Sequence, residues 1–356
     1  MDYRGIEIRV THADVFTHAA DLLVLKHAQE SYGVDEKAIV VTGVDRAELP
    51  GIGSDLLIEQ PYQLPYRQLL FLGVEPLYKF NYRSIRDFSR RALAKAMRIT
   101  PPVREITMTL HGVGFGLDET EAFESEVAGI VEAIDSRRYP QSLQTVSIIE
   151  RGANRAARMQ RALESLLGPV ASSPVAASPP APSLPAPGRA PSRETPAGEA
   201  QAPRRVDSVG YNSAARPHAF VAMPYGESFE DVFYYGIQPP VRSAGLLCER
   251  MDLISFTGDI VDHMREKISS ASILVADLSE ANPNVYLEIG YAWGVQTPCV
   301  LVCNRKSDLK FDLRGQRCLH YSSIMELEKS LSAELRALRP RPGGPNGARG
   351  SRRQRC

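Results

Sequence analysis

The sequence predicts two α/β domains joined by a linker rich in Pro, Ala and Ser. In two stretches of the 356-residue chain, short β-rich runs alternate with segments of helical spacing. Ten of the 26 prolines lie between Pro169 and Pro203, and no aromatic residue occurs from Gln141 to Val209. Such a segment buries too little apolar surface to offset the entropy lost on ordering. We therefore expect a disordered linker over 169–217, and for the same reason a disordered basic tail over 339–356.

The first domain, residues 1–168, reads as a layered α/β sheet. β-rich runs predict strands at 6–10, 21–27, 38–43, 69–74, 105–112 and 145–149. Helical spacing of apolar residues predicts helices at 82–98, 119–135 and 154–167.

The second domain, residues 218–338, repeats the alternation with shorter connections. The predicted strands are 218–223, 245–250, 272–278, 299–303 and 317–321, and the predicted helices are 228–244, 258–270, 284–296 and 324–337. Five strands separated by helices are typical of a flavodoxin-like, doubly wound parallel sheet.

The net charge of zero is a cancellation between segments. Residues 1–168 carry 20 basic and 23 acidic side chains, residues 218–338 carry 11 and 16, and the tail carries six Arg and no acid. Both domains are therefore mildly acidic, which disfavours a nucleic-acid partner. For the tail, a solvated end is favoured over contact with RNA or an acidic partner.

Targeting, metal and cofactor signals are absent from the sequence. The amino terminus has no basic start followed by an apolar run, and no window of about 18 apolar residues occurs, so we expect a cytoplasmic protein without a membrane partner. The five cysteines include no C-x-x-C pair and the seven histidines are scattered. These patterns predict neither a metal site nor a disulfide framework, and no cofactor is expected.

Ligands of open parallel sheets bind at the carboxyl ends of the strands, so the residues that follow each strand of 218–338 are candidates. The candidate ligand-contacting residues are Met223, Tyr225, Ser228, Phe229, Asp259 and Asn284. Ser228 and the backbone amides of 226–229 suit a phosphate, or a plain helix cap. Asp259 suits a ribose hydroxyl or a helix cap. Asn284 is interpreted either as a helix cap or as a ribose ligand.

The most informative run is 275–294, VADLSEANPNVYLEIGYAWG. It places Asp277 at the end of a buried strand and Glu288 in the following helix, near the positive amino-terminal pole. Gly290 and Ala292 leave room beside Glu288 for a flat ligand. A carboxylate held there suits a nucleophile or a partner for an oxocarbenium ion. Alternatively, Glu288 pairs with Arg314 or Arg317, and Asp277 only stabilises a turn.

This run, together with AFVAMPYGESF (219–229) and FDLRGQR (311–317), resembles the nucleoside 2-deoxyribosyltransferase-like family and its bacterial TIR-like relatives. The resemblance covers about residues 218–325. It implies that Glu288 attacks the anomeric carbon of a nucleoside or nucleotide, and that Asp277 orients the base and the nucleophile. The family's strand end and base-binding carboxylates are replaced here, the latter by Asn-Pro-Asn at 282–284. Hydrolysis of a nucleotide or dinucleotide is therefore expected before base transfer.

The notable segment of the first domain is HGVGFGLDE (111–119), which follows a strand and precedes an acidic helix. Alternate glycines let backbone amides approach a phosphate, although a structural turn explains them as well. With residues 8–15, the segment resembles macro-like domains, which bind ADP-ribose-type ligands. The resemblance matches Asp14 to the adenine-reading Asp, and Gly112, Gly114 and Gly116 to the phosphate loop.

Together these features predict an N-glycosidase that cleaves the base–ribose bond of NAD or another nucleotide through Glu288. Sensing by the first domain, homo-oligomerisation and a role in bacterial stress or antiphage defence follow from the resemblance alone. Whether the enzyme is an N-glycosyl hydrolase or a transferase is left open. The alternative is a non-catalytic nucleotide-binding signalling module that acts by assembly.

Overall fold

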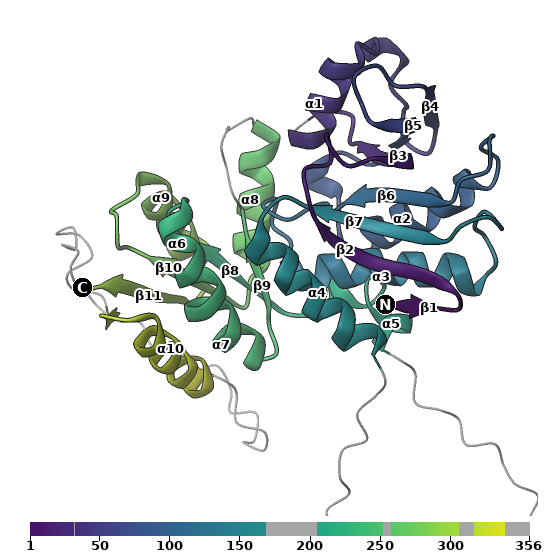
Figure 1. Cartoon of the computed structure of the whole chain (residues 1–356). Helices are drawn as coiled ribbons and strands as arrows, with labels where there is room; N and C mark the ends of the chain where they lie inside the picture. Colours follow the sequence, from purple (N-terminus) through teal and green to yellow (C-terminus); the bar gives the residue numbers. More distant parts are fainter. Residues whose placement is uncertain (32, 169–204, 252–257, 306–316, 339–356) are drawn as a thin grey trace, which may run out of the picture. The chain divides into compact units, whose positions relative to one another are not determined.

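The computed structural model describes residues 1–31, 33–168, 205–251, 258–305 and 317–338 (Figure 1). These residues form two compact units. Unit 1 contains Met1–Glu75, Tyr82–His111 and Phe123–Ser213; unit 2 contains Pro76–Asn81, Gly112–Ala122 and the described residues from Ala214 onward. The predicted tail and most of the predicted linker, 169–204, lie outside the described residues. No helix within the described ranges combines the length and apolarity that crossing a bilayer requires.

Unit 1 is built on a seven-stranded mixed sheet in the order β1-β2-β7-β6-β3-β5-β4 (Figure 1). The strands are β1 (Asp2–Tyr3), β2 (Ile6–His12), β3 (Ala20–His27), β4 (Asp55–Glu59), β5 (Tyr66–Gly73), β6 (Glu105–Thr109) and β7 (Thr145–Glu150). The five inner strands are parallel, and β1 and β4 close the two edges antiparallel. The helices are α1 (Gly33–Thr42), α2 (Tyr82–Ala96), α4 (Ala153–Leu167) and α3 (Glu119–Asp135) from Phe123 onward, with a short 3₁₀ turn η1 (Arg46–Glu48). The first turn of α3 and the 3₁₀ turn η2 (Leu77–Lys79) belong to unit 2.

One predicted strand of this sheet is wrong, and an edge strand was not predicted. Residues 38–42 of the predicted strand 38–43 lie in α1, and Gly43 follows its end. The run is β-branched, but only Ala38 and Ile39 are buried, and Val40 is 67% exposed, as on a helix that packs one side. Asp35 and Glu36 lie in the first turn, where negative charges interact favourably with the positive end of the helix dipole and so stabilise the helix. No signal in the sequence predicted β4, an edge strand whose terminal residues Asp55 and Glu59 are exposed.

Unit 2 has a five-stranded, fully parallel sheet in the order β12-β11-β10-β8-β9. The strands are β8 (His218–Ala222), β9 (Leu247–Arg250), β10 (Ile273–Asp277), β11 (Cys299–Asn304) and β12 (Cys318–Tyr321). Numbered along the unit, this is the order 2-1-3-4-5 of doubly wound sheets, so the predicted fold class is confirmed.

Helices cover both faces of the unit 2 sheet (Figure 1). One face packs against α8 (Gly258–Ser270) and α9 (Pro283–Gly294). The other packs against α10 (Ile324–Leu338) and a helical stretch made of α6 (Glu227–Asp231), the π-helical η4 (Val232–Ile237) and α7 (Gln238–Ser243). Alternate residues of each strand therefore pack into two apolar cores, one on each face of the sheet. Close packing in both cores restricts movement of the strands.

Unit 2 takes a segment from the first half of the sequence. The Gly116 amide donates to the Arg250 carbonyl over 3.1 Å, and Gly114 forms a β-bridge to Met251, so this segment lies along the end of β9. Asp118 is fully buried; its carboxylate accepts the backbone N–H of Cys248 over 3.0 Å. Periodicity, which is local, gave no indication of this pairing.

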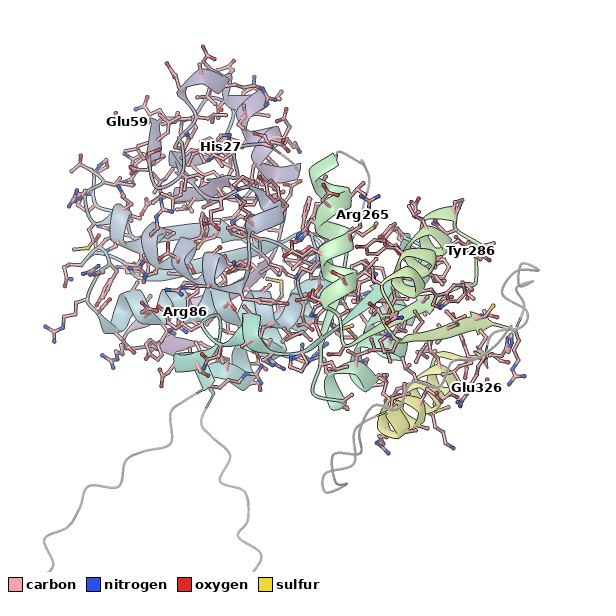
Figure 2. All side chains as sticks on the ribbon, turned by 180° about the vertical axis from the view of Figure 1, so that it is seen from behind. His27, Glu59, Arg86, Arg265, Tyr286 and Glu326 are labelled. Atoms are coloured by element: carbon pink, nitrogen blue, oxygen red, sulfur yellow. The ribbon has the colours of Figure 1, made fainter. Side chains whose placement is uncertain are left out.

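The predicted linker is too long at its carboxyl end, because residues 205–217 are ordered. They contain α5 (Arg205–Ser208) and the 3₁₀ turn η3 (Ser213–Ala215). The buried Arg86 guanidinium, labelled in Figure 2, donates to the carbonyls of Val206 over 3.0 Å and Val209 over 2.6 Å. Arg205 pairs with Glu124 of α3. These contacts stabilise a segment whose own apolar content is low.

Candidate functional site

The candidate site lies at the carboxyl edge of the unit 2 sheet, where the strand order reverses. β9 pairs with one edge of β8, and β10, the next strand in the chain, pairs with the opposite edge of β8. The loops that follow β8 and β10 therefore flank the topological switch point, where doubly wound sheets bind ligands. The first loop carries Met223 and Tyr225, and the second carries Asp277 into α9.

The start of α9 is fixed by a side-chain cap. The Asn282 side chain accepts the backbone N–H of Asn284 over 2.9 Å, and Pro283 occupies the first helical turn. Ala281, just before the cap, adopts φ +50, the left-handed region that ends the preceding turn. The cap is thus Asn282, whereas Asn284, predicted as a cap or ribose ligand, is the donor inside the helix.

Glu288 is 3% exposed and lies on the core side of α9. Burial raises the pKa of its carboxyl to about 8. It accepts no hydrogen bond from any other described residue. Arg317, one of the two partners considered for it, instead pairs with Glu334 over 2.6 Å, and Arg314 lies outside the described residues. A buried carboxyl with a pKa near neutrality is typical of functional sites.

The direction in which Glu288 faces follows from helical spacing. Residues three and four apart share a helix face, so Glu288 lies on the side that carries Asn284 and Tyr291. The Arg265 guanidinium of α8 lies 5.9 Å from the centre of the Tyr291 ring. Glu288 therefore lies on the α8 side of α9; Figure 2 labels Arg265 on α8 and Tyr286 on α9.

Asp277 is fully buried at the end of β10, and both carboxylate oxygens are bound. Oδ1 accepts the backbone N–H of Ser279 over 2.9 Å and also the Ser279 hydroxyl. Oδ2 accepts the hydroxyl of Tyr321 over 2.9 Å. Sequence reasoning missed Ser279 and Tyr321. The available signals were the Asp-x-Ser turn spacing and a tyrosine at the end of the last strand.

The predicted ligand-contacting residues that follow β8 are of two kinds: some are buried in the apolar core and others are exposed. Met223 and Phe229 are 1% and 6% exposed and belong to the apolar core. The hydroxyl of Tyr225 donates to the Met251 carbonyl, while Ser228 is exposed at the start of α6. The Arg250 guanidinium at the end of β9 lies 5.8 Å from the Tyr225 ring centre. Asp259 lies in the first turn of α8, and its side chain is outside the described part.

The four ligand-binding residues predicted for the first domain do not belong to one unit. Asp14 lies in unit 1, where its carboxylate accepts the Phe16 amide over 2.9 Å in a local turn. Gly112, Gly114 and Gly116 belong to unit 2 and have φ values of +81, +86 and +84. Because the Gly116 amide is bound to Arg250, it is not available to a phosphate. These contacts match the structural-turn interpretation of the glycines.

A second buried polar cluster lies at the carboxyl edge of the unit 1 sheet. Lys26 near the end of β3 forms a buried ion pair with Asp35 of α1. Burial raises the pKa of Asp35, and burial together with the Lys26 charge lowers that of His111. Sequence reasoning assigned no role to these side chains. Across the described ranges, no group of three or more His, Cys, Asp or Glu is arranged to hold a metal.

Comparison with known proteins gives structural neighbours only. No family model and no curated protein matches the sequence. A mutant macrodomain from Oceanobacillus iheyensis with ADPR aligns to 47% of this chain and 96% of its own, at 15% identity and a TM-score of 0.39. A Trypanosoma brucei macrodomain in complex with ADP aligns to 44% of this chain and 69% of its own, at 18% identity and a TM-score of 0.38. Each of these alignments covers slightly less than half of this chain.

Proposed function

We propose that unit 2 is an N-glycosidase that cleaves the base–ribose bond of a nucleotide or dinucleotide through Glu288. The observation that carries this proposal is the Glu288 carboxyl, which is buried, unpaired among the described residues and carried by the helix that follows β10, a strand next to the switch point. A buried carboxyl without a partner costs stability, so its retention favours a chemical role. The resemblance of residues 275–294 to deoxyribosyltransferase-like enzymes supports the substrate class.

The proposed reaction has two displacement steps. The Glu288 carboxylate attacks the anomeric carbon, the C1′–N bond breaks, and its electron pair leaves with the base. Water then adds at the same carbon and loses a proton, which releases the carboxylate and the sugar product. If a second base replaces water, the same ester gives transfer. The short-lived positive charge on the sugar is stabilised by the adjacent carboxylate.

The raised pKa of Glu288 bears on the substrate. With a pKa of about 8, the carboxyl of the free protein is mainly neutral at pH 7, whereas the nucleophile must be ionised. A ligand that brings a positive charge within about 4–6 Å favours the ionised form. The nicotinamide ring of NAD is cationic and becomes neutral on leaving. NAD is therefore the first substrate to test.

One observation favours the second candidate, a nucleotide-binding module that acts by assembly. The carboxylate that was expected to orient the base, Asp277, already binds three donors from Ser279 and Tyr321. Recognition without chemistry requires no free carboxylate at that position. The same cleavage experiment separates the two proposals, because a binding module retains its ligand unchanged.

The test is mass spectrometry of a nucleotide mixture that contains NAD, incubated with the full chain and with Glu288→Gln. We expect free base from one class of nucleotide with the wild type and none above background with the variant. Glu126→Gln is the matched control, because Glu126 is also a buried helical glutamate but lies in unit 1. Absence of base release by the wild type contradicts the proposal. Equal release by Glu288→Gln contradicts the role of Glu288.

A further inference from the structure

Three strands of unit 2 are tied together at their carboxyl ends by two hydroxyl groups. The Tyr321 hydroxyl of β12 donates to Asp277 of β10 over 2.9 Å. The Ser279 hydroxyl bonds the same carboxylate and accepts the backbone N–H of Asn304, the last residue of β11, over 2.9 Å. It also lies 3.2 Å from the Tyr321 hydroxyl. The network thus spans β10, β11 and β12.

A short turn connects this network to Glu288. The Leu278 amide donates to the Val302 carbonyl over 2.9 Å, and the Ala281 amide donates to the Leu278 carbonyl over 3.2 Å. Asn282 then caps α9. The axial position and rotation of α9, and with them the direction of Glu288, therefore depend on where Asp277 and Ser279 hold this turn.

We propose that Tyr321 and Ser279 act through Asp277 as positioning residues, which fix the start of α9 and so the placement of the Glu288 carboxyl. The inference deepens the proposed function and rests on it. With three donors on its two oxygens, the Asp277 carboxylate serves the chain rather than the ligand.

The hydroxyl of Tyr321 matters because it and its acceptor are buried. Tyr321 is 3% exposed and its ring packs in the apolar core, while Asp277 is fully buried. Burial and the adjacent Asp277 raise the pKa of Tyr321, so the hydroxyl keeps its proton and remains a donor at physiological pH. Removing the hydroxyl leaves one oxygen of a buried carboxyl without its donor, which destabilises this arrangement of the turn.

The first test compares two tyrosines of the same core with NAD as the probe. Tyr321→Phe removes the hydroxyl that binds Asp277; Tyr234→Phe is the matched control, because the buried Tyr234 hydroxyl binds Glu119 over 2.7 Å. We expect Tyr321→Phe to lower kcat about 10- to 100-fold with KM within about twofold. Tyr234→Phe should leave both within about twofold. Equal kcat values for the two variants overturn the proposal.

The second test separates positioning by Asp277 from catalysis by its charge. In Asp277→Asn, the amide keeps an acceptor for Ser279 and can donate to the Tyr321 oxygen; Asp277→Ala keeps neither bond. We expect Asp277→Asn to stay within about fivefold of wild type and Asp277→Ala to lose at least as much kcat as Tyr321→Phe. If the two Asp277 variants are equally impaired, the charge is required and the positioning role is wrong.

A third measurement does not depend on activity and separates failure of the proposed function from failure of this inference. The difference in unfolding midpoint between Glu288 and Glu288→Gln proteins is measured from pH 5 to pH 9, with and without Tyr321→Phe. The unfolding midpoint of the Glu288→Gln protein should exceed that of the Glu288 protein by more at higher pH, because the buried carboxyl resists ionisation. If Tyr321→Phe displaces α9, the carboxyl becomes exposed, and we expect the difference to increase less with pH. An unchanged pH dependence overturns the inference, even if the wild type releases no base.

Discussion

Two buried glutamates, one in each unit, both lack a hydrogen-bond partner among the described residues and are assigned different roles. Glu126 of α3 in unit 1 is 0% exposed, and neither carboxyl oxygen has a hydrogen-bond partner among the described residues. Glu288 of α9 in unit 2 is 3% exposed and also lacks a described partner. Burial raises the pKa of both carboxyls, well above the ordinary value for Glu126 and to about 8 for Glu288.

Their difference lies in where their helices begin. Both face a neighbouring helix: the backbone carbonyl of Glu126 accepts the Ser89 hydroxyl of α2 over 2.8 Å, and Glu288 lies on the side of α9 that faces α8. Of the two, Glu288 alone lies on a helix that begins at the strand ends held together by the Asp277 network. The comparison teaches that burial without a partner does not by itself mark a site; the proposal for Glu288 depends also on a helix that begins at the strand ends of a parallel sheet.

The largest expected effect is on base release. Glu288→Gln should lower the rate by about 10³-fold or more, because an amide cannot form the ester, whereas Glu126→Gln should leave it within about twofold. Initial rates of base formation from NAD, measured by mass spectrometry, provide the check. A comparable loss in both variants would remove the distinction between the two glutamates.

Asp118, a third buried acid, differs from both glutamates because its carboxylate has bonding partners. Asp118 accepts bonds from the Arg242 guanidinium over 3.0 Å, the Cys248 amide over 3.0 Å and the Glu121 amide over 2.9 Å. Asp118→Ala removes the acceptor of all three donors, so we expect a loss of about 3–5 kcal/mol in the free energy of unfolding. Denaturant melts of the full chain measure this. Glu36→Ala, which breaks the more exposed pair with Arg46, is the control and should cost less than about 1 kcal/mol.

Substitution of either unpaired glutamate should raise the free energy of unfolding, whereas substitution of Asp118 should lower it. The folded-state pKa of Glu288 is raised, so its contribution to stability is full below the unfolded pKa of about 4.5 and is lost as pH rises to about 8. Glu288→Gln should therefore stabilise the protein by up to about 3 kcal/mol at pH 7 and by little near pH 4. Glu126→Gln should change stability with the same sign. Thermal melts across this range decide; destabilisation at pH 7 would contradict the burial argument.

The smallest effect is the pH dependence of the rate. If ionised Glu288 is the nucleophile, kcat/KM should rise with pH and level off above about 8. Between pH 7 and pH 9 the ionised fraction, and with it the rate, should increase about tenfold. The profile should be unchanged in Glu126→Gln. A rate that falls over this interval would indicate that the neutral carboxyl acts as an acid.

Periodicity predicted what depends on local sequence. The strands of unit 2, the helix that carries Glu288 and the turn after Asp277 were all predicted, because each is encoded within about 20 consecutive residues. The helix Gly33–Thr42 was missed, since a β-branched run gives the same signal in a half-buried helix as in a strand.

Long-range pairings were beyond the sequence for a different reason. Tyr321 is 44 positions from Asp277, and Cys248 is 130 positions from Asp118. The residues near Asp277 do not specify which distant hydroxyl donates to its carboxylate. Any polar side chain at the end of a neighbouring strand would fit the local pattern. Such partners emerge only once the strand order is known.

The segment Gly112–Ala122, which belongs to unit 2, has a consequence for dissecting the protein. A gene fragment that begins after the linker encodes the five strands of the unit 2 sheet but lacks the residues that lie along β9. Proteolytic cleavage between 169 and 204 should, by contrast, leave two chains that co-purify, because unit 2 would then be shared between them. The protein is therefore suited to reconstitution from two separately expressed halves, and unsuited to exchange of unit 2 as a single continuous fragment.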